Sequence, residues 1–164
     1  MKSRMCALLA VLVVGASLMV RAQGAPEIQG AWRVTEVSGT GANAPPNKSP
    51  QPGLYIFTKR HYSIVSVGGT TSRENLAAPQ DPEKLTDAEK IARYEAWEML
   101  TANTGTYEIT GTTLTTHPMV AKNPSVVGTP ATREFKIDGK TLILIQKSAT
   151  RPGTETRTVL TRVE

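Results

Sequence analysis

Cysteine is almost absent from this sequence, since Cys6 is the only one among 164 residues. It lies close behind Arg4 and inside the apolar run Met5–Val20. A lipidated cysteine would stand at the end of such a run, so we expect no lipid attachment. Once the N-terminal segment is removed, no thiol remains, which excludes disulfides, thiol catalysis and cysteine–metal sites. The remaining chain is long enough to bury a sufficient core without disulfides.

The same N-terminal segment has the parts of a secretory signal. Lys2 and Arg4 form the basic region, residues 5–20 the apolar region, and Val20-Arg21-Ala22 offers small or apolar residues for cleavage. The apolar run is shorter than the roughly 20 residues that a membrane-spanning helix needs. We therefore predict a signal peptide over residues 1–22, with a cut near Ala25 as second choice, and an exported chain, periplasmic or secreted, over 23–164. A retained N-terminal anchor is the alternative.

A clustered basic face is also missing. The chain carries a formal net charge of +5, but Lys2, Arg4 and Arg21 belong to the predicted signal. The mature chain then has 16 basic and 14 acidic residues, without the cluster that a nucleic-acid binder needs. Two histidines without a carboxylate pattern predict no metal site. No phosphate loop, paired carboxylate or Ser–His–Asp spacing occurs, so we predict no cofactor and no catalytic residue, and leave enzymatic activity open.

Short β-rich segments with links of hairpin length dominate the rest of the chain. We expect strands at 31–37, 54–58, 62–67, 106–109, 113–117, 132–137, 141–147 and 156–163. Asp138-Gly139, between two of these segments, is a strong signal for a tight turn. Eight antiparallel strands in a chain of this size predict a closed up-and-down β-barrel, with a sandwich as the alternative.

Two segments interrupt the strand pattern. Residues 39–53 are rich in Gly, Pro, Asn and Ser and predict a long loop, which leaves open whether it covers a barrel mouth. Residues 86–89, Thr-Asp-Ala-Glu, form a capping box at the start of a helix, and Asn103-Thr104-Gly105 is a plausible end for it. We expect this helix between the third and fourth strands, with Tyr94 and Trp97 packed on a sheet.

The two ends of the predicted barrel carry a family signature. Gly30-Ala31-Trp32 opens the first strand and Arg162 lies on the last one. This pair resembles the Gly-x-Trp motif and the late basic residue of lipocalins and their calycin relatives. The resemblance implies that Gly30, Trp32 and Arg162 are structural residues, with the arginine packed across the tryptophan at the barrel bottom. An arginine over an indole face is attractive through the ring quadrupole.

Stretches in the middle of the chain resemble the lipocalin-like domain family of small bacterial and fungal proteins. They are Thr104–Ile109, Asn123-Pro124, Gly128-Thr129, Arg133–Phe135 and Asp138–Leu142. The resemblance covers residues 28–164 and implies an eight-stranded antiparallel barrel of the calycin superfamily, with one inserted helix. It implies little about chemistry, because the activity of this family is poorly defined.

Strand alternation predicts which side chains face the barrel interior. It places Tyr107, Arg133 and Gln146 there as polar groups, among apolar side chains such as Phe135 and Leu144. A mostly apolar interior with a few polar groups is typical of a small-molecule site, in which Arg133 would anchor a carboxylate or another anion. In the alternative, Arg133 pairs with an acidic partner or ordered water and only closes the fold, or side chains fill the barrel.

Three hypotheses follow from these patterns. The first is a non-catalytic carrier or sensor of a small, mostly hydrophobic ligand, with or without an anionic group, outside the cytoplasm. The second is an isomerase or cyclase, which needs distant residues such as Tyr107, His117 and Arg133 to meet at a barrel mouth. The third is a module that contacts another protein through the 39–53 loop or the helix. We expect no membrane insertion after signal cleavage, and leave the ligand and the oligomeric state open.

Overall fold

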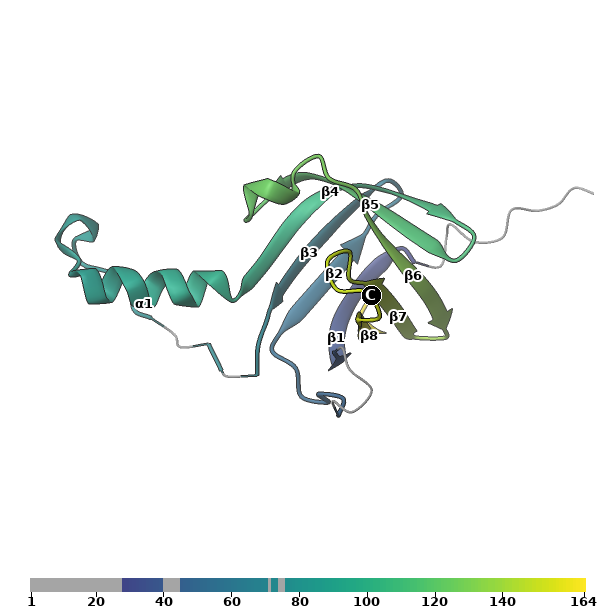
Figure 1. The fold of residues 1–164 in the computed structure, drawn as a ribbon, viewed down its shortest axis with the longest axis horizontal. Helices are drawn as coiled ribbons and strands as arrows, with labels where there is room; N and C mark the ends of the chain where they lie inside the picture. Colours follow the sequence, from purple (N-terminus) through teal and green to yellow (C-terminus); the bar gives the residue numbers. More distant parts are fainter. Residues whose placement is uncertain (1–27, 40–44, 71, 74–75) are drawn as a thin grey trace, which may run out of the picture.

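Eight antiparallel strands form one closed barrel, in which each strand pairs with the next and β8 pairs with β1 (Figure 1). The computed structural model describes residues 28–39, 45–70, 72–73 and 76–164, so the predicted signal peptide lies outside the described residues. The elements are β1 Gly30–Ser38, β2 Gly53–Phe57, β3 His61–Val67, η1 Pro82–Lys84, α1 Asp87–Glu98, β4 Leu100–Thr110, β5 Thr113–Ala121, η2 Pro124–Val126, β6 Ala131–Asp138, β7 Thr141–Lys147 and β8 Glu155–Arg162. The predicted fold is confirmed.

Alternating burial shows which face of each strand looks inward. In β7, Leu142 and Leu144 are buried, whereas the residues between and beside them keep some exposure. The inward faces together form one apolar core. Its buried members are Ile28, Trp32, Val34, Phe57, Tyr62, Ile64, Leu114, Leu142, Leu144 and Leu160. Within the described residues, no helix is both long and apolar enough to span a membrane.

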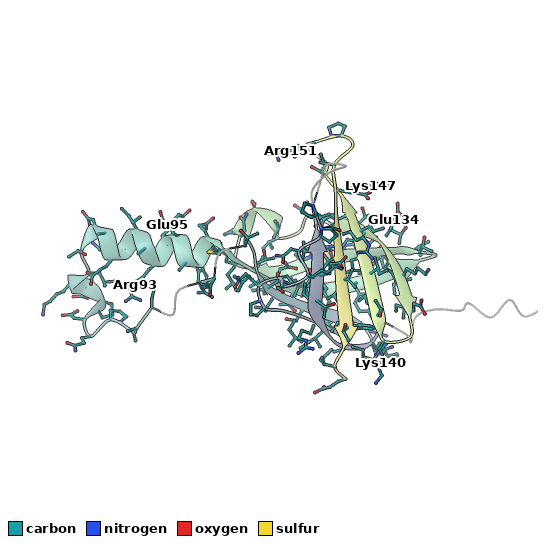
Figure 2. The ribbon with its side chains drawn as sticks, turned by 90° about the horizontal axis from the view of Figure 1, so that it is seen from below. Arg93, Glu95, Glu134, Lys140, Lys147 and Arg151 are labelled. Atoms are coloured by element: carbon teal, nitrogen blue, oxygen red, sulfur yellow. The ribbon has the colours of Figure 1, made fainter. Side chains whose placement is uncertain are left out.

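The two ends of the barrel differ. We call the end with the β2–β3, β4–β5 and β6–β7 turns the closed end, and the end with the β1–β2 loop and the β7–β8 turn the open end. Figure 2 shows Lys140 and Arg151 at these opposite ends. At the closed end, Trp32 is fully buried and its Nε1 donates to the carbonyl oxygen of Ile28 at 2.7 Å. The Arg162 guanidinium lies 4.1 Å from the centre of the Trp32 ring.

Gly30 makes room for this closure. Its φ is +126°, a region that side chains with a Cβ rarely adopt. A Cβ there would also lie 2.3 Å from the carbonyl oxygen of Glu164 and 2.6 Å from Nη1 of Arg162. Glycine is therefore required where the chain end and the arginine cross the start of β1.

The helix begins as predicted but ends earlier. The capping box is present: the Thr86 amide donates to the Glu89 carboxylate at 2.8 Å and the Glu89 amide donates to the Thr86 hydroxyl at 3.3 Å. The predicted end near 103–105 is wrong, since α1 ends at Glu98 and β4 starts at Leu100. Residues 100–106 pair with β3 instead, and this backbone pairing outweighs the local helix propensity.

The expected packing of the helix on a sheet is also wrong. The helix projects away from the barrel, as both views show (Figures 1 and 2). It leads into the end of β4 that is opposite the β4–β5 turn. No residue of α1 is buried, and Tyr94 and Trp97 keep 62% and 50% of their surface exposed. We call residues 81–98 the arm.

Candidate functional site

A cavity of about 210 Å³ lies inside the barrel toward its open end. Most side chains around it carry a hydroxyl, amide or guanidinium group. They are Tyr55, Ile64, Ser66, Thr101, Asn103, Arg133, Leu144, Gln146, Thr156 and Thr158. The interior is therefore polar at this end, which corrects the prediction of a largely apolar interior. The apolar side chains instead fill the part of the barrel near Trp32.

Alternation on β8 was the signal that could have predicted this polarity. Thr156 and Thr158 share a strand face with the buried Leu160, because side chains two residues apart point the same way. The faces of β2 and β3 are apolar on both sides in the sequence. Only the pairing of those strands shows that Tyr55 and Ser66 point inward and Leu54 and Val65 outward.

A second, outer cavity of about 430 Å³ adjoins the first and shares Tyr55, Ser66 and Thr158 with it. Part of its wall comes from the β1–β2 loop, through Pro45, Asn47, Pro50 and Gln51. The loop is fixed to the rim by paired backbone hydrogen bonds between Val37 and Asn47, at 3.0 and 2.8 Å. The described part of the 39–53 loop therefore borders the open end of the barrel.

Arg133 on β6 lines the inner cavity. Its Nη1 donates to the Thr116 hydroxyl at 3.2 Å, and this buried hydroxyl donates to the carbonyl oxygen of Ala131 at 3.1 Å. Arg133 forms no ion pair with any carboxylate in the part of the chain that the structure describes. A guanidinium group has five N–H donors, so it keeps donors for other acceptors at the cavity.

Burial and charge act together around this guanidinium group. Burial lowers the pKa of Arg133, and the nearby hydroxyl groups of Tyr55 and Tyr62 oppose that shift. Burial raises the pKa of Tyr55, against the Arg133 charge and a hydrogen bond with Ser66. An arginine stays protonated in proteins, so the cavity contains one positive charge among neutral polar groups. A bound anion would offset the cost of burying that charge.

Tyr62 lies among the buried residues next to this cluster. It is only 1% exposed, and its hydroxyl lies near Thr116 and Arg133 without a hydrogen-bond partner of normal geometry. Burial raises the pKa of Tyr62. The sequence identified neither Tyr62 nor Thr116 as part of the site. The inward face of β3 could not be assigned from its pattern, and Thr116 meets Arg133 only through the pairing of β5 with β6.

The structure brings together three of the five predicted ligand residues. Arg133, Leu144 and Gln146 line the inner cavity. Tyr107 and Phe135 line neither of the two cavities. The Tyr107 hydroxyl donates to the carbonyl oxygen of Thr58 at 2.7 Å, and Phe135 packs against the core. Both face inward as predicted, but their places along the strands put them nearer the closed end.

The three residues considered for catalysis do not meet. Tyr107 is engaged at the β2–β3 turn, and Arg133 lies in the cavity. His117 keeps substantial exposure on the outer surface, where its Nε2 lies 3.4 Å from Oε1 of Glu108. Among the described residues, no group of three or more His, Cys, Asp or Glu side chains could hold a metal ion.

Comparisons with known proteins gave one family match and two similar solved structures. A family model described as a lipocalin-like domain matches residues 29–163. The chain is similar to a crystal structure of a lipocalin-like protein from Bacteroides uniformis ATCC 8492, with 13% identity, a TM-score of 0.45 and coverage of 82% of this chain and 97% of that one. It is also similar to an uncharacterized protein from Bacteroides eggerthii DSM 20697, with 10% identity, a TM-score of 0.43 and coverage of 82% and 98%. No curated protein matches the chain.

Proposed function

Because the chain belongs to the lipocalin-like domain family, we propose that it is a non-catalytic carrier or sensor that binds a small amphipathic anion in its barrel. The anionic group binds at Arg133, and the apolar part extends toward the open end. The observation that carries this proposal is a partly buried guanidinium group that lines a cavity without a carboxylate partner in the described chain. A positive charge left unpaired in a barrel favours a ligand of opposite charge.

The two cavities favour an amphipathic ligand over a fully polar one. The inner cavity offers Asn103, Gln146 and Thr156 as hydrogen-bonding groups beside the guanidinium. The walls of the outer cavity include apolar side chains, among them Val34 and Val37. A head group with two or more oxygens, such as a carboxylate or a sulfonate, suits the planar fork of an arginine. The hydrocarbon part of the ligand then moves out of water and into the outer cavity. The volume of this cavity, about 430 Å³, is in the usual range for ligand pockets.

Two fluorescent probes with one skeleton test the charge requirement. 8-Anilinonaphthalene-1-sulfonate carries a sulfonate, and N-phenyl-1-naphthylamine is the same skeleton without it. We expect the sulfonate probe to bind more tightly, because a hydrogen-bonded charge is worth about 1.5–3 kcal/mol, or roughly 10–100-fold in Kd. Fluorescence titration at fixed ionic strength measures both affinities.

Two variants test whether the difference in affinity between the two probes comes from the side chain of Arg133. Arg133→Met should abolish the preference for the sulfonate probe while leaving the neutral probe nearly unaffected. Lys136→Met is the matched control, because Lys136 lies on the same strand, is exposed and has the same charge. Equal affinity of the native protein for the two probes, or an unchanged preference in Arg133→Met, would contradict the proposal. Mass spectrometry of ligands extracted from the purified protein then identifies the natural compound.

Export is the second part of the proposed function, and the sequence of residues 1–22 supports it. A basic start, an apolar run and Val20-Arg21-Ala22 are the parts of a cleaved secretory signal. We expect the full-length chain, expressed in a bacterial host, to appear outside the cytoplasm with Gln23 as its first residue. N-terminal sequencing checks this, and a chain that keeps Met1 or stays in the cytoplasm would contradict it.

A further inference from the structure

The arm exposes a row of large apolar side chains. Ile91, Tyr94 and Trp97 keep 58%, 62% and 50% of their surface exposed. They follow one another at intervals of three residues, so they lie along one side of α1. The arm also contacts the preceding segment, because Nη2 of Arg93 donates to the carbonyl oxygen of Ala77 at 2.7 Å. We call Ile91, Tyr94 and Trp97 the apolar row.

A helix of this kind depends on a partner. α1 has 12 residues, none of them buried, and isolated helices of this length are marginal in water. Most helical stability in proteins comes from packing an apolar face. In the described chain, the apolar row has a contact at Trp97, whose ring centre lies 6.0 Å from Nζ of Lys122, and all three side chains stay at least half exposed. A contiguous exposed apolar patch, unlike single scattered side chains, is typical of an interaction surface.

The arm's own barrel does not supply this partner. α1 continues through Met99 directly into β4, and the amide of Gly68 donates to the carbonyl oxygen of Met99 at 2.7 Å. Nζ of Lys122 lies 3.0 Å from Oε1 of Glu98 at the same place. These contacts fix the base of the arm, which extends away from the barrel (Figures 1 and 2).

The arm and the barrel carry net charges of opposite sign. The arm, residues 81–98, has six acidic and three basic residues, a net charge of −3. The described barrel segments, residues 28–39, 45–70 and 99–164, have six acidic and twelve basic residues, a net charge of +6. The arm of one molecule is therefore electrostatically complementary to the barrel of another, and complementary charge steers association and fixes register.

The outer surface of β2 and β3 has the matching apolar character. Leu54, Ile56 and Val65 keep 41%, 39% and 45% of their surface exposed, and Leu54 and Val65 lie directly opposite each other. On the other side of Leu54, its partner on β1 is the exposed Arg33. Arg33 forms no ion pair in the part of the chain that the structure describes. We call Leu54, Ile56 and Val65 the receiving face.

We propose that two copies of this chain form a reciprocal dimer, in which the apolar row of each arm packs on the receiving face of the other barrel. The contact joins apolar surfaces at its centre, and Arg33 beside them meets acidic side chains of the arm such as Glu95. Each copy contributes the same pair of surfaces, so the dimer is closed by a two-fold axis and contains two identical contacts.

Sedimentation velocity of residues 23–164, which include the whole described barrel and arm, tests this over a range of concentrations. We expect a monomer–dimer equilibrium that shifts toward monomer as NaCl rises from about 50 mM to about 500 mM, because salt screens the arm–barrel attraction. A native protein that stays monomeric at its highest soluble concentration in low salt would overturn the proposal.

Two variants separate the two surfaces. Ile91→Ala with Tyr94→Ala removes most of the apolar row while raising helix propensity, and Val65→Glu puts an acidic group on the receiving face. Each should raise the dimer Kd at least about 100-fold. Thr132→Glu is the control for the added charge. Thr132 is exposed on β6, which lies four strands away from β2 in either direction around the barrel. The Thr132→Glu variant should dimerise normally.

Mixing the two variants distinguishes this dimer from one in which arms pack on arms. A mixed dimer of the Val65→Glu chain and the Ile91→Ala/Tyr94→Ala chain has one intact arm on one intact receiving face. We expect it to form with an affinity between those of the native protein and of either variant alone. A Val65→Glu chain that dimerises as well as the native chain, or a mixture that stays monomeric, would overturn the proposal.

Discussion

Replacing Arg133 by Met should stabilise the empty protein and at the same time remove its preference for an anion. Met has a similar length and no charge, so the substitution removes the buried charge without opening a large cavity. The loss is one hydrogen bond, from Nη1 of Arg133 to the hydroxyl of Thr116. Thr116 keeps its own bond to the carbonyl oxygen of Ala131, so the hydroxyl is not left without a partner.

The expected change in the free energy of unfolding follows from comparing the lost hydrogen bond with the removed cost of burying the charge. The hydrogen bond to a charged group contributes about 1.5–3 kcal/mol. Burying an ion without a partner costs several kcal/mol, and apolar replacement of buried ionic groups is commonly neutral or stabilising by about 1–4 kcal/mol. We therefore expect the free energy of unfolding of the empty protein to rise by about 1–2 kcal/mol in Arg133→Met.

Urea denaturation followed by circular dichroism measures this change, with and without 8-anilinonaphthalene-1-sulfonate. A probe at 100 times its Kd should stabilise the native protein by about 2.7 kcal/mol and the variant much less. The stability advantage of the variant should thus shrink by about 1–2 kcal/mol when the probe is added. If Arg133→Met lowers the stability of the empty protein by more than about 1 kcal/mol, Arg133 serves the fold and the reasoning is refuted.

Two further predictions concern single positions. A Cβ on Gly105 would lie 2.0 Å from the carbonyl oxygen of His117, so Gly105→Ala should lower the melting temperature by roughly 5 °C or more, whereas Gly39→Ala, with open space around it, should not. Hydrogen bonds from Thr86 lower the pKa of Glu89. The capping box therefore contributes its full stability when the pH is above the ordinary pKa of a glutamate. That stability is lost as the pH falls through the lowered pKa of Glu89. A carboxyl NMR titration should show this low midpoint, and Thr86→Ala should raise it; an unchanged midpoint contradicts the assignment.

Local patterns predicted the strands, the inward side of β6 and the start of the helix, because these features depend on neighbouring residues. Alternation in residues 132–137 indicated that Arg133 faces inward with Phe135, and the capping box at 86–89 marked the start of the helix. The tight turn at Asp138-Gly139 is present, with Gly139 at a φ of +57°. In each case, the physical cause lies within a few residues of the sequence position.

Local patterns failed where strand pairing decided the outcome. Residues 100–105 have helix and cap signals, yet the neighbouring β3 offers them backbone hydrogen bonds, and β4 therefore begins directly after the helix. The distance of an inward residue from the open end also depends on register. Tyr107 and Arg133 both face inward, but only Arg133 reaches the cavity.

Alternation and turn signals, which depend on nearby residues, predicted the strand order and the inward side of β6. The family resemblance implied that Gly30, Trp32 and Arg162 close one end of the barrel, and Arg162 does lie over the Trp32 ring. Strand pairing and packing decide that Tyr55, Ser66 and Arg133 meet at the inner cavity, that the described part of the 39–53 loop borders the outer cavity, and that the arm is exposed. Those features arise where residues far apart in the sequence come together or fail to do so. Pairing register and long-range packing set such meetings, and no local pattern encodes them.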